Sequence, residues 1–276
     1  MVEGTCFLSV IPVRSEPSGK SEMVNQILFG ERFKVLEVYK NWNKIQTIHD
    51  NYEGWVESNQ ISKIIKSQSL SSYQSDSIEE SISSLLIHDL TATFTSKEGN
   101  LTLLYGSKIS LIGNYLIIGN TKYSHSQGTI GETLKYNESN LVESAMKLMN
   151  APYLWGGRTP FGIDCSGLIQ IAFRMTGVDM PRDAWQQAQV EGTFIDLIAE
   201  AREGDIAFFD NDEGKIIHTG ILTNRGTIIN ANGKVREDII DHQGIFNREL
   251  GIYTHKLRFI KRFNENLICQ KLGDYK

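Results

Sequence analysis

A cysteine stands where a glycine-rich stretch of the sequence meets an apolar-periodic segment. Gly156, Gly157 and Gly162 precede Cys165, and apolar residues follow it at helical spacing as far as Gly177. This pattern predicts a helix that begins at the cysteine and ends at a glycine cap. A thiol at a helix N-terminus lies at the positive end of the macrodipole, which favours the nucleophilic thiolate. Cys165 is therefore a candidate nucleophile.

The alternative interpretation is a buried structural cysteine, which is the commoner fate of an isolated Cys. Two features of the same stretch favour chemistry instead. The glycines would let the backbone approach a ligand closely, and Asp164, next to the sulfur, is an unusual residue for a core. Both interpretations stay open on this stretch alone.

A cysteine nucleophile needs a nearby base, usually a histidine, and a third polar group that orients the imidazole. His218 opens the apolar strand predicted over residues 218–222, where its ring would face other strands. A core histidine is the alternative there. The other histidines fall in loops or at segment edges, where we expect solvated surface: His49, His88, His125, His242 and His255.

The third group follows from the geometry of a predicted hairpin. Strands over 218–222 and 226–230 flank residues 223–225. A three-residue loop places His218 directly opposite Asn230 on the same face of the sheet, whereas a two-residue loop would break this pairing. The Asn230 carbonyl could then accept a hydrogen bond from the imidazole and fix its tautomer. Because no metal-binding spacing occurs, we predict neither a metal site nor a cofactor.

Composition limits the class of protein. The 276 residues are 40% hydrophobic and 22% charged, which is typical of a soluble protein with two or three domains. The net charge of −5, without a basic block, argues against a nucleic-acid partner. No apolar run is long enough to span a membrane. The N-terminus lacks a signal-peptide pattern, so a cytoplasmic location is expected, although a trimmed export signal would leave the same sequence.

Changes in composition divide the chain into four parts. Residues 1–64 contain short alternating strands that suggest a small barrel. Serine-rich residues 65–87 predict a linker with one short helix, whose apolar face would be formed by Ile82, Leu85 and Leu86. Residues 88–136 form a second small β unit. Residues 137–276 combine helices with later strands, which indicates an α+β domain.

Within this last part we expect three helices followed by an antiparallel sheet. The first helical stripe runs from Leu141 to Met149 and is ended by Pro152. The cysteine helix follows, and Asp183 predicts the cap of a third helix that reaches Val190. Strands are predicted over 205–210, 218–223, 226–231 and 257–263. The three cysteines (Cys6, Cys165 and Cys269) are too few for a disulfide framework.

The motifs of the last part resemble the NlpC family of papain-like cell-wall peptidases. The similar segments are 151–157 (APYLWGG), 162–167 (GIDCSG), 181–183 (PRD), 204–206 (GDI) and 218–221 (HTGI). The segments 29–31 (FGE) and 52–55 (YEGW) resemble bacterial SH3-like domains, and together the chain resembles the γ-D-glutamyl-L-diamino acid endopeptidases. The resemblance implies an α+β papain-like catalytic domain preceded by two small SH3-like β-barrels.

The resemblance also implies roles for individual residues. Cys165 matches the nucleophile, His218 the base, Tyr153 a tyrosine near the oxyanion, and Asn230 a position that is often a third histidine. The implied substrate-binding residues are Asp164 and Ser166 for a free amine, Tyr52 and Glu22 from the SH3-like domain, Trp155, and Arg182. Glu16 is a rival to Glu22.

The implied function is hydrolysis of the γ-D-Glu–diamino acid bond in murein peptides that have a free N-terminal L-Ala. The partner is then the peptide substrate, with no nucleic acid, no membrane and a monomeric protein expected. Two alternatives remain: a non-catalytic peptidoglycan-binding protein, weakened at Asn230, and a thiol acyltransferase or amidase on the same fold.

Overall fold

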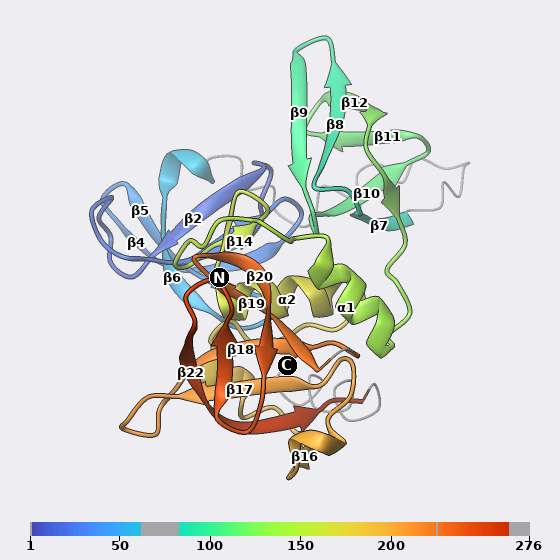
Figure 1. The fold of residues 1–276 in the computed structure, drawn as a ribbon. Helices are drawn as coiled ribbons and strands as arrows, with labels where there is room; N and C mark the ends of the chain where they lie inside the picture. The colour runs from blue at the N-terminus through green and yellow to red at the C-terminus, as the bar shows by residue number, and fades with distance from the viewer. Residues whose placement is uncertain (1, 62–82, 225, 265–276) are drawn as a thin grey trace. The chain divides into compact units, whose positions relative to one another are not determined.

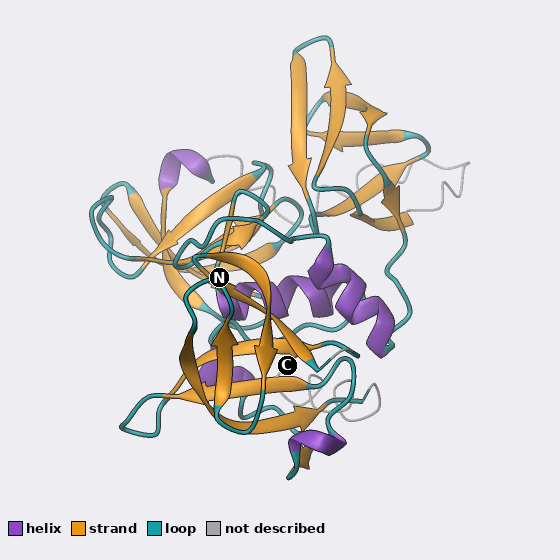
Figure 2. Ribbon diagram, in the orientation of Figure 1, coloured by secondary structure: helices purple, strands orange, loops and turns teal. Residues whose placement is uncertain are grey.

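The computed structural model describes residues 2–61, 83–224 and 226–264 (Figure 1). The chain divides into two compact units, Met1–Glu132 and Thr133–Lys276. In the described ranges the first unit is built almost wholly from strands, and the longer helices lie in the second (Figure 2). The boundary after Glu132 lies close to the predicted start of the last part at residue 137.

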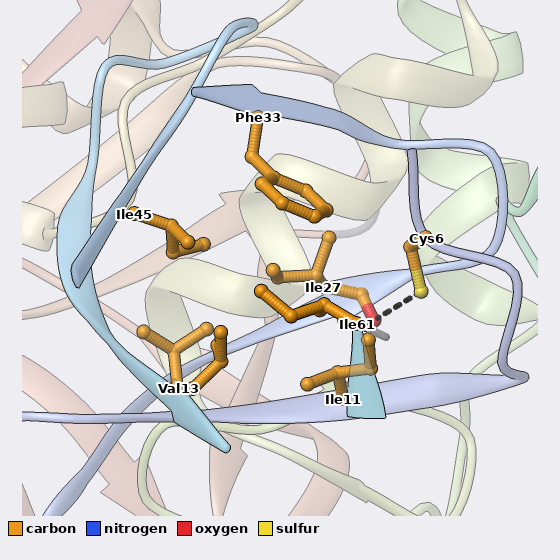
Figure 3. Packing of buried hydrophobic residues seen from close by; sticks show 8 residues of the cluster. Cys6, Ile11, Val13, Ile27, Phe33, Ile45 and Ile61 are labelled. Carbon is orange, nitrogen blue, oxygen red and sulfur yellow. Dashed lines mark hydrogen bonds between the residues drawn. The ribbon is translucent and has the colours of Figure 1, made fainter. Parts of the chain in front are cut away.

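The N-terminal sheet of the first unit has the antiparallel strand order β1-β4-β5-β6-β2-β3. Its core contains Cys6, Ile27 and Phe33, all of which are almost fully buried (Figure 3). This arrangement agrees with the small barrel predicted for residues 1–64. The elements are β1 (Val2–Thr5), β2 (Val10–Arg14), β3 (Met23–Leu28), β4 (Arg32–Tyr39), β5 (Trp42–Thr47), β6 (Glu53–Glu57) and the 3-10 helix η1 (Ser58–Gln60).

The second sheet of this unit has the order β13-β7-β10-β11-β12-β8-β9. Its elements are β7 (Ser83–Ile87), β8 (Thr91–Ser96), β9 (Gly99–Leu104), β10 (Lys108–Ile112), β11 (Tyr115–Ile118), β12 (Thr121–Gln127) and β13 (Ile130–Gly131). Leu85 and Leu86 were predicted on a helix, but they lie in β7 because that segment pairs with β10 and β13. The rest of the predicted linker and helix, residues 65–82, lies outside the described residues.

The second unit packs helices against an antiparallel sheet, as predicted for an α+β domain. The sheet order is β16-β22-β17-β18-β19-β20-β21, and β22 also pairs with β21, which closes the sheet. Helices α1 and α2 pack together, and α2 contacts β18 and β19 (Figure 1). The helices are α1 (Glu138–Met146), α2 (Cys165–Met175), α3 (Ala184–Gln187) and the 3-10 helix η4 (Ile198–Glu200).

The strands of this unit extend beyond the predicted set. They are β14 (Arg158–Thr159), β15 (Gly162–Ile163), β16 (Thr193–Ile195), β17 (Ile206–Asp210), β18 (Ile216–Leu222), β19 (Thr227–Asn232), β20 (Lys234–Ile240), β21 (Gly244–Asn247) and β22 (Ile252–Arg262). The predictions found β17, β18, β19 and the end of β22. They missed β20, whose charged residues obscure the apolar alternation, and β21, which is only four residues long.

Helix ends follow local capping chemistry. Asn137 caps α1 by accepting a hydrogen bond from the Asn140 backbone N–H at 2.8 Å. The structure ends α1 at Met146, earlier than predicted, and α3 is a single turn that stops at Gln187 rather than Val190. Within the described ranges, no helix is both long enough and apolar enough to cross a membrane.

Candidate active site

Helix α2 presents Cys165 at its first residue, as the sequence predicted. The carboxylate of Asp164 caps this end by accepting a hydrogen bond from the Gly167 backbone N–H at 2.7 Å. At the other end Gly177 has a φ of 82°, and the backbone N–H of Val178 donates to the Phe173 carbonyl at 3.1 Å. These bonds form a Schellman motif, so the predicted glycine cap is confirmed.

Asp164 is also half of a buried ion pair. Nη2 of Arg182 donates to Oδ2 of Asp164 at 2.5 Å and Nη1 donates to Oδ1 at 3.0 Å. The backbone N–H of Gly156 donates to the same carboxylate at 2.8 Å, and the Ser166 hydroxyl donates to it at 3.2 Å. Both charged side chains are nearly inaccessible to solvent. The pair is therefore electrically neutral and fixes the loop that precedes the cysteine.

Three glycines around the cysteine are needed because neighbouring segments of the protein pack closely against them. A Cβ on Gly157 would lie 2.4 Å from the Gly162 carbonyl oxygen, and a Cβ on Gly167 would lie 2.3 Å from the Gly157 carbonyl oxygen. A Cβ on Gly162 would meet the side chain of Leu154 at 2.6 Å. We expected Gly157 and Gly162 to let the backbone approach a ligand, and the close approach that the structure shows at both is between neighbouring segments of the protein.

Strand β18 brings His218 to the cysteine. The backbone of Thr219, the residue after His218, hydrogen-bonds the Cys165 sulfur and lowers the pKa of the thiol. His218 is 4% exposed, and its Nε2 lies 3.2 Å from Oδ1 of Asn230. The predicted contact between His218 and Asn230 is thus present.

The strand register behind that contact differs from the prediction. Asn230 pairs directly with Gly220, and Leu222 pairs with Ile228, so the turn spans residues 223–226 and β19 begins at Thr227. The register shifts by two residues, which preserves the face of the sheet. His218 and Asn230 are consequently diagonal neighbours rather than an opposed pair.

Asn230 is the first member of a longer polar chain that the sequence analysis missed. Its Nδ2 donates to Oδ2 of Asp238 at 3.1 Å, and Nε of Arg236 donates to both oxygens of Asp238 at 2.9 and 3.0 Å. Both residues lie in β20. No strand was predicted from the sequence in this segment.

A second missed residue is His255, which lies in β22. Its ring stacks on the ring of His218 with a centroid distance of 3.8 Å and an interplanar angle of 14°. The prediction of solvated surface is therefore wrong for His255. The strand containing it begins at Ile252, before the apolar stretch at residue 257 that signalled it.

Burial sets the resting protonation state of the pair. Burial raises the pKa of the Cys165 thiol to about 12, with a further increase from the charge of Asp164. Backbone hydrogen bonds and Arg182 lower that pKa, but they are outweighed. Burial lowers the pKa of His218 to about 3, and His255 adds to this effect. Both shifts favour a neutral thiol and a neutral imidazole, in the direction opposite to the thiolate that the helix N-terminus was expected to favour.

Tyr153 lies at the entrance of the same site. Its backbone N–H donates to the Gly233 carbonyl at 2.9 Å, and its side chain is 37% exposed. Burial raises the pKa of the phenol to about 12, and the nearby Cys165 and Asp164 add to this. The tyrosine hydroxyl is therefore protonated and able to donate a hydrogen bond. Trp155 is 58% exposed in the adjoining loop.

Two predicted substrate-binding residues belong to the other unit. Glu22 is exposed just before β3, and Tyr52 is half-buried just before β6. The Tyr52 backbone is fixed by its N–H, which donates to the Thr47 hydroxyl at 3.1 Å. Roles for Glu22, for Tyr52 and for the rival residue Glu16 stay predictions.

The two units match two known kinds of domain. Residues 150–254 match the NlpC/P60 family, and residues 13–61 match the bacterial dipeptidyl-peptidase SH3 domain. The chain therefore combines an NlpC/P60 domain with a bacterial SH3 domain. The resemblance of the second sheet, residues 83–131, to a further SH3-like barrel stays a prediction.

Named relatives agree with this combination. The chain is 33% identical to gamma-D-glutamyl-L-lysine dipeptidyl-peptidase of Bacillus subtilis (strain 168) over 121 residues, which are 42% of this chain and 40% of that protein. It is 27% identical to dipeptidyl-peptidase 6 of Lysinibacillus sphaericus over 215 residues, which are 71% of this chain and 77% of that protein.

A solved structure supports the fold. The crystal structure of an NlpC/P60 family protein from Bacillus cereus ATCC 10987 matches 95% of this chain and 99% of its own, with a TM-score of 0.78 and 16% identity. At this level of identity the likeness concerns the fold.

Proposed function

We propose that the protein is a cysteine peptidase that hydrolyses the γ-D-Glu–diamino acid bond of murein peptides with a free N-terminal L-Ala. The observation that supports this most is the position of the Cys165 sulfur. It lies at the start of α2 and against the backbone of β18, next to a buried His218 whose Nε2 is held by Asn230. A candidate nucleophile thus lies beside the strand that carries a candidate base and the group that orients it.

The hydrogen bond to Asn230 decides which nitrogen of His218 acts as the base. The carbonyl oxygen of Asn230 accepts a hydrogen bond from Nε2–H, which leaves the lone pair on Nδ1 for the thiol proton. Because the resting pair is neutral, the proton moves to Nδ1 as the sulfur attacks the γ-amide carbonyl. The imidazolium is then present only while negative charge develops on the substrate.

The later steps use the donors that the family resemblance implies. The backbone N–H of Cys165 and the hydroxyl of Tyr153 stabilise the tetrahedral oxyanion, and one such donor contributes about 3–4 kcal/mol. His218 gives its proton to the leaving amine, and the C–N bond breaks. Water then attacks the thioester, and its proton passes through His218. The products are L-Ala-γ-D-Glu and the free diamino acid or peptide.

Recognition of the substrate amine needs a negative charge that Asp164 does not supply alone. Its carboxylate is neutralised by Arg182 and accepts several other hydrogen bonds. An ammonium group would therefore meet a neutral pair, and a second carboxylate would supply the charge. Glu22 and Glu16 are the candidates predicted from the sequence. The name of the Bacillus subtilis relative, gamma-D-glutamyl-L-lysine dipeptidyl-peptidase, supports the γ-D-glutamyl specificity, and the match covers 40% of that protein's length.

Two synthetic peptides test the proposal directly. The protein is incubated with L-Ala-γ-D-Glu-meso-diaminopimelate, with and without an N-acetyl cap, and the products are identified by mass spectrometry. The proposal expects cleavage of the free-amine peptide alone. A Cys165→Ala variant with an unchanged circular dichroism spectrum is the control and should release no dipeptide.

Other outcomes of this test lead to different functions. Cleavage of both peptides would keep the peptidase and remove the requirement for a free amine. Cleavage of neither, with binding retained, would favour a peptidoglycan-binding protein. Transfer of the acyl group to an added amine would favour an acyltransferase. The monomeric state and cytoplasmic location stay proposals from the sequence.

A further inference from the structure

A line of polar side chains continues from the active site across two strands. Arg236 in β20 pairs directly with Asn230 in β19, and Asp238 pairs with Ile228 two residues away. Asn230, Arg236 and Asp238 therefore lie on one face of the sheet, with Asp238 diagonal to Asn230. Asn230 and Asp238 are almost fully buried, so their hydrogen bonds are shielded from water.

Arg236 also binds the Asp238 carboxylate that faces Asn230. Nε of Arg236 donates to its two oxygens at 3.0 and 2.9 Å. The guanidinium in turn donates from Nη1 to Oε2 of Glu249 at 2.9 Å and from Nη2 to Oδ1 of Asn247 at 3.2 Å. The carboxylate is thus charge-balanced and fixed in orientation, with Oδ2 toward Asn230.

This arrangement distinguishes the two ends of the Asn230 amide. An ionised carboxylate only accepts hydrogen bonds, so Asp238 requires the NH₂ end of the amide. The carbonyl end must then face Nε2 of His218, at 3.2 Å. If the amide turned over, its NH₂ group would face Nε2, and the ring proton would move to Nδ1, where the thiol proton is needed.

We infer that Asp238, held by Arg236, is a positioning residue that fixes the Asn230 amide and thereby the tautomer of His218. An asparagine has no intrinsic preference for which end meets the imidazole, and Asp238 supplies that preference. The inference rests on the proposed thiol chemistry of Cys165, but it can be measured without a peptide substrate.

The first test is alkylation of Cys165 by iodoacetamide at pH 7, followed by mass spectrometry of the labelled peptide. Removal of the thiol proton by His218 is needed whatever the natural substrate is. Asp238→Ala should slow alkylation by about 10-fold to 100-fold, the range typical for loss of a group that orients a functional histidine. An unchanged rate in a folded variant would overturn the inference, even if the peptides are cleaved.

A double-mutant cycle separates positioning from general damage. If Asp238 acts through Asn230, Asp238→Ala should change the alkylation rate less than about twofold when Asn230→Ala is already present. If the two losses multiply, Asp238 acts by another route and the inference fails. When the substrate is a peptide that the protein cleaves, Asp238→Ala should lower kcat and leave KM within about twofold of the parent value.

Two further variants control for folding and for charge. Asp205 pairs with Arg262 through contacts of 2.8 Å and is 1% exposed, so Asp205→Ala removes a matched buried carboxylate elsewhere in the domain. It should lower the melting temperature without slowing alkylation. Asp238→Asn retains an acceptor for Asn230, so it should alkylate within about threefold of the parent. If a folded Asp238→Asn is as slow as Asp238→Ala, the hydrogen bond is not the cause, and the inference is wrong.

Discussion

The thiol pKa is raised at both described cysteines, but the surroundings of the two thiols differ. Cys6 is 1% exposed and Cys165 is 6% exposed, and burial raises the pKa of both thiols to about 12. Cys6 lies among apolar side chains, and its thiol donates to the carbonyls of Leu8 and Ile27 (Figure 3). Cys165 lies at a helix start, where backbone hydrogen bonds and the charge of Arg182 lower its pKa.

The difference shows that thiol pKa alone does not distinguish a core cysteine from a nucleophile. At Cys6, burial and the charge of Glu31 raise the thiol pKa and outweigh a backbone hydrogen bond with Leu8 that lowers it. At Cys165, hydrogen bonds and a nearby positive charge favour the thiolate. They stabilise the negative charge that forms on the sulfur when the thiol loses its proton. The two sites differ in whether a base is available to take the thiol proton, because only Cys165 has a buried histidine in the same group of residues.

The largest expected effect comes from deleting each thiol in turn. Cys165→Ala should reduce peptide turnover to background because the nucleophile is absent, while the fold is retained. Cys6→Ala should leave kcat unchanged and cost about 1 kcal/mol of unfolding free energy, because core packing and the weak thiol hydrogen bonds are lost. Turnover of the murein tripeptide and urea unfolding of both variants measure the contrast. Equal loss of turnover in the two would mean that the comparison is wrong.

The next effect concerns the polar surroundings of Cys165. Asp164→Ala removes the carboxylate that pairs with the buried Arg182, and breaking such a pair costs roughly 3–5 kcal/mol of unfolding free energy. The matched control is Glu3→Gln, which breaks the exposed pair with Arg32 and should cost about 0–1 kcal/mol. Urea unfolding at pH 7 measures both. A cost for Asp164→Ala as small as that of the control would show that the pair does not stabilise the domain.

Acid should weaken the site that contains the histidine. The folded pKa of His218 is about 3 and the unfolded value is about 6.5. Between these values the unfolded state binds the extra proton, so the contribution of His218 to stability is full above pH 6.5 and falls by about 1.4 kcal/mol per pH unit below it.

A neutral replacement tests this assignment. His218→Gln should remove that part of the pH dependence in urea unfolding measured between pH 7 and pH 4. Mutation of the exposed His242 to Gln is the control and should leave the slope as it is. If His218→Gln and the parent protein show the same slope, the imidazole is not buried in its neutral form.

The smallest expected effect concerns the substrate amine. Glu22→Gln and Glu16→Gln are compared for KM with the free-amine tripeptide. The residue that meets the ammonium should raise KM severalfold when neutralised, because an ion pair near a surface contributes about 1 kcal/mol or less. The other variant serves as its control. If neither changes KM, the amine is recognised without a carboxylate from the N-terminal domain.

The sequence predicted what local chemistry determines. The cysteine helix, its glycine cap and the strand that carries His218 all follow from spacing and capping. The face of the sheet shared by His218 and Asn230 was also predictable, because side chains alternate with a period of two. Their register was not, since it depends on where β19 begins, and the turn extends to Gly226.

The residues that the sequence did not reveal act through long-range contacts. His255 reaches His218 from a strand that begins well before its apolar stretch. Asp238 and Arg236 lie two residues apart in a strand whose charges suggest exposure, and only the pairing of β19 with β20 brings them to Asn230. A buried ion pair of this kind has no signature in hydrophobic periodicity.

The glycine contacts beside the cysteine have a consequence for directed evolution. Gly157, Gly162 and Gly167 each lack the space for a Cβ because of a neighbouring segment, and the obstacle for two of them is another glycine's carbonyl. Single substitutions there will be purged from a mutant library whatever activity is selected. Diversity aimed at a new specificity is better placed at Trp155 and Phe161, whose side chains are 58% and 68% exposed on the same loop.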